Sequence, residues 1–146
     1  MNCKENKTVD FIADTGALDT FTNNLTDFTT FKDLNGSIQT ADKSSSLNIT
    51  GYGMVFLRHK VIIKGKKHNV TSKISPVYYA PGMAYQLFSV GSLLQKGYFL
   101  NREKKKMTIR KPDGTSIMDF YPCAQDPSIY WLSAQVVKSK DRKSVV

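Results

Sequence analysis

The chain contains 146 residues, 40% of them hydrophobic, which is typical of one folded domain and not of a disordered chain. No apolar run approaches the roughly 20 residues that a membrane-spanning helix needs, and no apolar stretch follows the charges at the amino terminus, so we expect a cytoplasmic protein without membrane contact. The formal net charge of +9 predicts a non-specific attraction to polyanions, RNA among them.

Short segments rich in Val, Ile, Tyr, Phe and Thr recur along the chain, separated by Gly, Pro, Asn or Asp. In chain order they cover residues 8–13, 36–41, 47–57, 60–66, 76–80, 97–101, 106–111 and 129–132. Such segments, repeated about every ten residues, predict an all-β barrel or sandwich. The sequences ADKSSS (41–46) and KPDGTS (111–116) predict the tips of two hairpins.

The segment YQLFSVGSLLQKG interrupts this β pattern. Its residues Leu87, Val90, Leu93 and Leu94 fall close to one face of a helix, and a glycine follows as a stop. We therefore expect one short helix near residues 86–96.

The expected organisation is one β domain over residues 9–134. A flexible segment at 1–8 precedes it, and a basic tail at 135–146 follows it. Within the domain, residues 99–134 would form extension strands, whose role the sequence leaves open.

One acidic residue stands out in FIADTGAL, residues 11–18. Asp14 follows a β-prone run and precedes Thr15 and Gly16, so it could simply make a local turn with backbone amides. It could instead be the catalytic group of an aspartic peptidase, which needs two carboxylates about 3 Å apart that share one proton. No second Asp-Ser/Thr-Gly occurs in the chain. The second carboxylate would then be Asp14 of another copy, in a two-fold dimer.

Other catalytic and cofactor chemistries find little support. Cys3 and Cys123 lack the neighbours of a zinc site, and we expect two reduced thiols. The two histidines, His59 and His68, lie in lysine-rich stretches and are expected at the surface. The Gly-Tyr-Gly at 51–53 lacks the spacing of a nucleotide-binding loop and predicts a bend in a strand. We expect neither a metal nor a cofactor.

Several ordered segments together give the chain a specific resemblance. FIADTGA matches an aromatic-x-x-Asp-Ser/Thr-Gly-Ala pattern, and IQTADKSS followed by ITGYGMV matches a polar hairpin with its Gly-x-Gly strand. The most specific segment is VYYAPGMAYQLFSVGSLLQKGY, residues 77–98, and KMTIRKPDGTSI with SIYWL matches the approach to a pre-integrase region. Over residues 9–134 the chain resembles the retropepsin-like aspartic protease of copia-type LTR retrotransposons.

The resemblance implies a closed, retropepsin-like β-barrel with a flap hairpin, acting as a homodimer on extended segments of its own Gag-Pol polyprotein, within retrotransposon virus-like particles in the cytoplasm. Asp14 would be the catalytic aspartate, and the Thr15 hydroxyl would cross-link the two active-site loops. Support for the loop would come from Gly16, Ala17, Val90 and Gly91, with Val90 packing beneath it. The flap that holds the substrate through its backbone amides would comprise Thr40, Ala41, Asp42, Lys43, Ser44 and Ser45.

Two alternatives stay open at this stage. Only 13 residues precede Asp14, fewer than retroviral proteases use for their first strands and their dimer sheet. Either the strands after Gly97 replace that sheet, or the chain is a weak dimer whose activity depends on neighbouring polyprotein segments. The basic runs at 58–68, 102–106 and 138–143 also allow a second function, a non-catalytic protease-like barrel that acts as a basic RNA-binding or assembly module.

Overall fold

The computed structural model describes residues 8–39 and 46–138, which form ten strands, one 3-10 turn and one α-helix. The strands are β1 (Thr8–Asp14), β2 (Thr20–Thr22), β3 (Thr30–Gln39), β4 (Ser46–Ile63), β5 (Lys66–Tyr79), β6 (Gln86–Ser89), β7 (Phe99–Arg102), β8 (Met107–Arg110), β9 (Ser116–Pro122) and β10 (Tyr130–Val137). The 3-10 turn η1 spans Leu25–Asp27, and the helix α1 spans Val90–Gln95. No helix in these two ranges is long and apolar enough to cross a membrane.

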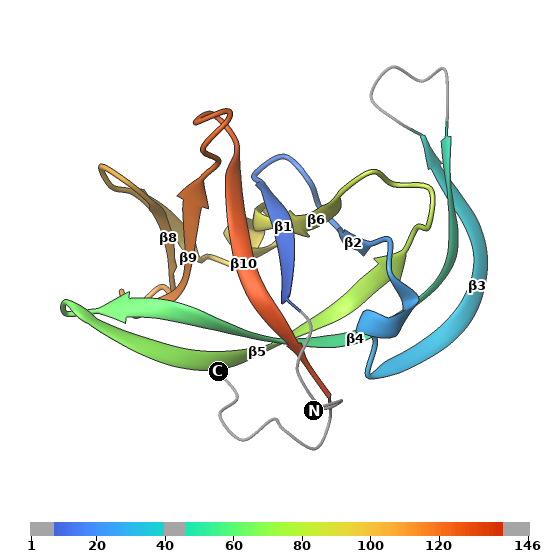
Figure 1. The fold of residues 1–146 in the computed structure, drawn as a ribbon, viewed down its shortest axis with the longest axis horizontal. Coiled ribbons are helices and arrows are strands. Elements are labelled where there is room, and N and C mark those ends of the chain that lie inside the picture. Colours follow the sequence, from blue (N-terminus) through green and yellow to red (C-terminus); the bar gives the residue numbers. More distant parts are fainter. Residues whose placement is uncertain (1–7, 40–45, 139–146) are drawn as a thin grey trace.

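Six of the described strands close into a barrel, which confirms the predicted all-β barrel fold. The ring runs β4, β5, β2, β6, β1 and β10, and a pairing of β10 with β4 closes it. Strand β3 extends the sheet beyond β4, and β9, β8 and β7 extend it beyond β10 (Figure 1). The amino-terminal strand β1 therefore lies inside the barrel wall, with a neighbour on each edge.

Alternating burial explains how β1 is held in this wall. Val9 and Phe11 are buried, whereas Thr8 and Asp10 on the opposite face are exposed. This period of two is the pattern of a strand with one face on the core. The inward side chains join a core that includes Val55 of β4, so the first strand is anchored by burial as well as by pairing.

The carboxy-terminal strand β10 closes the barrel by pairing with strands from distant parts of the chain. It runs antiparallel to β1, with Val9 opposite Ala134 and Phe11 opposite Leu132. Its last residues pair with β4, Val137 lying opposite Phe56. Because β10 ends at Val137, three residues that the sequence placed in the tail belong to this strand. Of the strands after Gly97, β10 therefore completes the barrel within one chain, and β7, β8 and β9 extend the sheet beyond it.

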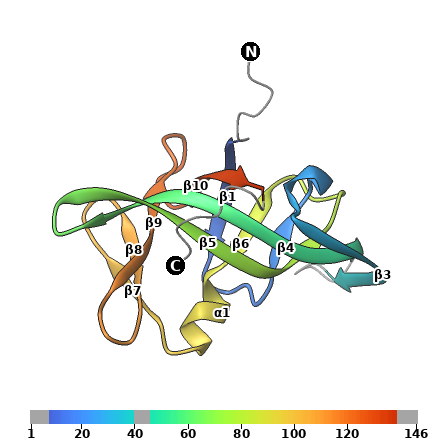
Figure 2. The same ribbon diagram turned by 90° about the horizontal axis from the view of Figure 1, so that it is seen from below.

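Strands β4 and β5 form one long hairpin where the sequence predicted separate short strands. Their turn is Lys64-Gly65, and both residues have positive φ (52° and 79°), as the tightest hairpin turns require. The predicted bend at 51–53 is present as a register shift between Gly53 and Val55. The outer part of the hairpin runs alongside β8 and β9 in both views (Figures 1 and 2), where the backbone N–H of Ile62 donates to the Asp119 carboxylate (2.9 Å).

The predicted helix at 86–96 is shorter than expected and follows a strand. Residues Gln86–Ser89 form β6, which pairs with β1 and β2, and the helix begins only at Val90. Ser89 is its N-cap residue, because its side chain accepts a hydrogen bond from Ser92 N–H. Sheet pairing on both sides of β6 therefore outweighed the helical spacing of Leu87.

Candidate active site

The aspartate singled out in the sequence is the last residue of β1. Asp14 is half-buried, and its Oδ1 accepts a hydrogen bond from the backbone N–H of Gly16 (2.8 Å). Thr15 and Gly16, which follow it, are exposed. The chain thus leaves the barrel wall at Asp14 in a short turn, and the bond to Gly16 holds the carboxylate on that turn.

Strand β6 and the start of α1 form the support behind this turn. Strands β1 and β6 are parallel, with Asp14 opposite Ser89. A Cβ atom built on Gly91 would lie 2.5 Å from the carbonyl oxygen of Ala17 and 2.7 Å from that of Thr15. Only a glycine permits so close an approach of two main chains. Val90, which the resemblance placed beneath the loop, is fully buried and belongs to the main core.

Two polar residues that the sequence analysis did not assign to the site fasten the turn further. The Ser89 hydroxyl donates to the carbonyl oxygen of Ala17, and the backbone N–H of Ser89 donates to Thr20 Oγ1 (2.9 Å). Both residues are buried. Ser89 comes directly before the apolar helical run, and serine is a preferred residue at the N-cap of a helix. This signal could have marked Ser89 in the sequence.

A buried polar cluster holds the neighbouring strand β2 in place. The Thr22 hydroxyl donates to Asp27 Oδ2 (2.8 Å), and Gln86 Nε2 donates to Thr22 Oγ1 and to Asp27 Oδ2 (both 2.6 Å). Thr22 and Asp27 are fully buried. Because buried polar groups are costly unless they are hydrogen-bonded, this cluster favours one arrangement of β2 against β6. These hydrogen bonds therefore fix the wall beside the Asp14 turn.

The outer face of the turn is open to solvent. Leu18 is 58% exposed, and Asp19 beside it is exposed as well. One carboxylate on a rigid turn can accept a proton, but the activation of water for peptide hydrolysis needs a second group close by. The exposed face of residues 15–19 is where such a group would have to approach.

Five of the predicted site residues come together, and six cannot be placed. Asp14, Thr15, Gly16 and Ala17 form the turn, and Gly91 lies against it. The proposed flap, Thr40 to Ser45, lies outside the described residues. Strands β3 and β4 are paired up to Gln39 and Ser46, the residues on either side of it.

One expectation about the histidines is wrong. His68 is exposed, but His59 is buried, with 3% of its surface accessible. His59 lies on the same face of β4 as Val61, which is also buried, because alternate residues of a strand share a face. Arg58 and Lys60, on either side of His59 in the sequence, alternate with it along β4 and are more exposed, so the local charge was a poor guide to its position.

One comparison with known families gives a match. A family model described as the beta-barrel domain of the Pol polyprotein matches residues 11–98. The matched part contains the Asp14 turn and the segment Ser89–Gly91 behind it, but it ends before the closing strand β10. No curated protein and no solved structure matches the chain.

Proposed function

Because the chain belongs to the family of Pol polyprotein beta-barrel domains, we propose that it is the aspartic endopeptidase of a retroelement, of the copia type. In this proposal two copies associate, and the Asp14 residues of both activate one water molecule. The substrate is an extended segment of the Gag-Pol polyprotein. The family supports an origin in a Pol polyprotein, and the geometry of the Asp14 turn supports the choice of chemistry.

The observation that carries the proposal is the close contact behind the aspartate. Gly91 approaches the carbonyl oxygens of Thr15 and Ala17 so closely that no side chain fits, and the Ser89 hydroxyl bonds to the same turn. An Asp that only ended a strand would need no such support. A catalytic carboxylate must be held in a defined position, and such support is what that position requires.

The proposed chemistry follows from two like charges held close together. Two carboxylates about 3 Å apart cannot both ionise at little cost, so the pair keeps one proton. The ionised member takes a proton from water, and the protonated member donates to the carbonyl oxygen of the substrate. Cleavage should therefore be fastest at mildly acidic to near-neutral pH, because the pair must hold one proton and not two or none.

The barrel leaves a specific route for association. Both edges of β1 are occupied, by β6 on one side and by β10 on the other. A second copy therefore meets the Asp14 turn end-on, through its exposed residues Thr15, Gly16, Leu18 and Asp19, and not by adding a strand to β1. This arrangement brings the two Asp14 carboxylates together across a two-fold axis.

Substrate binding would use the hairpin of β3 and β4. An extended peptide that pairs with a hairpin gains main-chain hydrogen bonds, while pockets select alternate side chains. The residues between the two strands, 40–45, are the proposed flap, and closing it over the pair of aspartates would exclude water.

A substitution of the catalytic group tests the proposal. Asp14→Asn keeps the size of the side chain and the acceptor for the Gly16 N–H, so the protein should fold, but it removes the ionisable group. Cleavage of an internally quenched peptide library should then be lost. Asp113→Asn makes the same change of charge on the exposed turn between β8 and β9, outside the proposed site, and should leave cleavage intact. Cleavage by the Asp14→Asn variant would contradict the proposal, and so would an absence of cleavage in both the original chain and Asp113→Asn.

A mixing experiment tests the shared site. Sedimentation equilibrium first gives the dimer dissociation constant, and the proteins are then mixed well above it. When an equal amount of Asp14→Asn is added and subunits exchange at random, roughly half of the original number of wild-type dimers should remain. The other wild-type chains are then paired with the variant, so cleavage should fall to roughly half. An equal amount of unrelated protein should have no effect. Undiminished cleavage would mean that each chain acts alone, and a wholly non-catalytic barrel would show no cleavage before mixing.

A further inference from the structure

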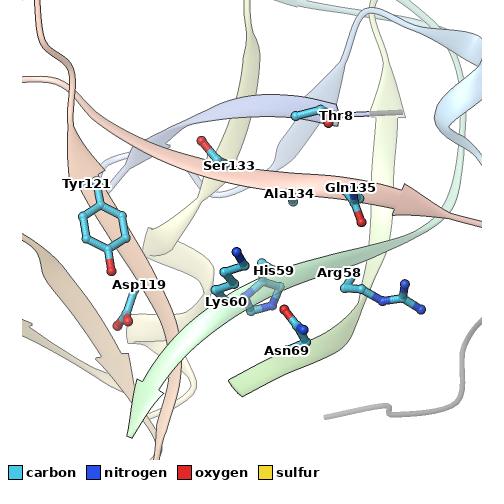
Figure 3. Close-up of a pocket in the computed structure, with 10 residues that line it drawn as sticks. All are labelled: Thr8, Arg58, His59, Lys60, Asn69, Asp119, Tyr121, Ser133, Ala134 and Gln135. Atoms are coloured by element: carbon cyan, nitrogen blue, oxygen red, sulfur yellow. The ribbon is translucent and has the colours of Figure 1, made fainter. Parts of the chain in front are cut away.

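A polar pocket of about 530 Å³ opens in the barrel wall at the end of β1 remote from Asp14. Strand β10 pairs with β9 only up to Trp131 and with β4 only from Gln135 onward, so the three strands separate between these positions. The pocket lies in this gap (Figure 3). Thr8 lines it, six residues along β1 from Asp14, which is about 20 Å at the usual rise of a strand.

The walls of the pocket carry an excess of positive charge. Arg58 and Lys60 line it, the first half-buried and the second exposed. Asp119 is the acidic residue of the lining, but its carboxylate is already paired with Lys106 (3.2 Å) and accepts from Thr108 Oγ1 (2.8 Å). Burial lowers the pKa of His59 to about 4, against the opposing effect of Asp119, so this ring is neutral near pH 7. An anionic group is the natural complement of such a lining.

The positive charge continues from the pocket along the β4–β5 hairpin. Residues directly opposite each other in the hairpin share a face, and Lys60 pairs with Asn69 while Ile62 pairs with Lys67. Lys67 therefore stands on the same face as Lys60, nearer to the turn. Residues 58–73 contain no Asp or Glu. An extended polyanion could follow this face from the pocket towards the turn.

Other lining residues favour a nucleotide over an acidic peptide. Tyr121 is 44% exposed, and its ring stands across the pocket from Arg58, with Lys60 between them in the view of Figure 3. Asn69 and Gln135 add side-chain amides that can donate and accept at once. The buried Nδ1 of His59 has no hydrogen-bond partner in the described ranges. Aromatic faces beside cations bind single-stranded nucleic acid by stacking, whereas a carboxylate chain gains nothing from them.

We propose that this pocket and the adjoining face of the β4–β5 hairpin bind single-stranded RNA, with one nucleotide in the pocket. Lys60 meets its phosphate, and Tyr121 stacks on its base. The following phosphates lie along the hairpin towards Lys67. A volume of about 530 Å³ is within the range of small-ligand sites, roughly 300 to 1,000 Å³. The site does not depend on the proposed peptidase activity, because it lies at the other end of β1 from Asp14.

Fluorescence anisotropy with a labelled oligouridylate of about ten nucleotides tests the proposal on the full chain. Lys60→Glu should weaken binding. The slope of log affinity against log salt concentration should also fall by about one, as expected for the loss of one phosphate contact. Lys32→Glu, at an exposed residue of β3 that pairs with Tyr52, eight positions along β4 from Lys60, makes the same change in net charge and should alter affinity by less than about twofold. Equal weakening by both variants would mean diffuse attraction to the whole chain and would overturn the proposal.

Substitutions of the aromatic residue separate RNA from other anions. Tyr121→Leu should weaken RNA binding by at least about fivefold, the lower limit for the loss of one stacked base. Tyr121→Phe keeps the aromatic ring and should bind RNA like the original chain. An acidic peptide such as polyglutamate should compete poorly. Equal competition by polyglutamate, with no effect of Tyr121→Leu, would assign the surface to acidic protein segments and overturn the proposal.

Two further measurements keep the result independent of folding and of peptidase activity. On the unmodified chain, amide NMR during a titration with uridine monophosphate should show shifts at the side-chain amides of Asn69 and Gln135, and their absence would count against the pocket. The Asp14→Asn variant should bind RNA like the original chain. Cleavage that survives in Asp14→Asn would contradict the peptidase proposal alone, whereas loss of RNA binding in this variant would contradict a separate RNA site.

Discussion

Gly91 lies directly behind Thr15, so close that a Cβ atom on Gly91 would be 2.7 Å from the carbonyl oxygen of Thr15. The residues are 76 positions apart in the chain. The contact exists because β1 and β6 run parallel, which brings the turn after β1 against the start of α1. The position of the Asp14 carboxylate therefore depends on a residue that carries no side chain.

Gly91→Ala should disturb this turn. The added methyl group would meet two backbone oxygens, which cannot rotate away as a side chain could, so the main chain must shift. We expect the free energy of unfolding to fall by about 1–3 kcal/mol and peptide cleavage to fall further, because the turn itself moves. Urea unfolding and the peptide library measure the two effects.

Gly16→Ala is the matched control for stability. There the new methyl group would lie 3.5 Å from Asp14 Oδ1, an ordinary contact. Its free energy of unfolding should stay within about 1 kcal/mol of the original chain. Equal stability of Gly91→Ala and the original chain would show that the contact behind the turn is not tight.

The burial of His59 predicts a loss of stability in acid. The pKa of His59 is lowered from 6.5 to about 4, first by burial and despite the Asp119 carboxylate nearby. Between these values the unfolded chain binds the proton and the folded chain does not, so stability is complete above pH 6.5 and declines as pH falls towards 4. A difference of this size corresponds to about 3 kcal/mol near pH 4. Urea unfolding from pH 4 to 7 measures the decline.

Substitution of each histidine isolates this effect. His59→Gln cannot take up the proton and should have a flatter dependence of stability on pH than the original chain, whatever its stability at pH 7. His68→Gln removes the exposed histidine and should keep the full dependence. If both variants decline as the original chain does, other groups cause the acid sensitivity.

Removal of β10 should prevent folding, although β10 lies outside the segment that the family model matches. A chain of residues 1–98 or 1–129 leaves β1 and β4 with unpaired edges and exposes the core that Leu132 covers. We expect neither to give the near-ultraviolet circular dichroism of a packed protein, whereas residues 1–138 should. A folded 1–98 chain would show that the barrel closes without its last strand.

A point substitution tests the same strand more gently. Leu132→Ala should lower the free energy of unfolding by about 2–5 kcal/mol, because the side chain is almost fully buried. Ser133→Ala, on the exposed face of the same strand, should change it by less than about 1 kcal/mol. Similar losses in both variants would mean that β10 contributes little through its buried face.

Features that depend on neighbours in sequence could be read without a structure. The alternation of β1, with Val9 and Phe11 on one face, and the turn at Asp113-Gly114 follow from side-chain period and turn chemistry, which are local. Local spacing gave the wrong answer for residues 86–89, where pairing with β1 and β2 outweighed a helical pattern. It was also wrong for His59, whose burial depends on the face of β4 and not on the adjacent Arg58 and Lys60.

By itself, then, the sequence determined an all-β chain with a carboxylate on a turn after its first strand. Only the tertiary structure decided that β10 joins β1 to β4, that Gly91 supports the turn, and that Tyr121 faces the same pocket as Lys60. These relationships join residues that are tens of positions or more apart. Their stability comes from the burial and hydrogen bonding that arise when distant strands pair, and no local pattern of side chains specifies which strands will do so.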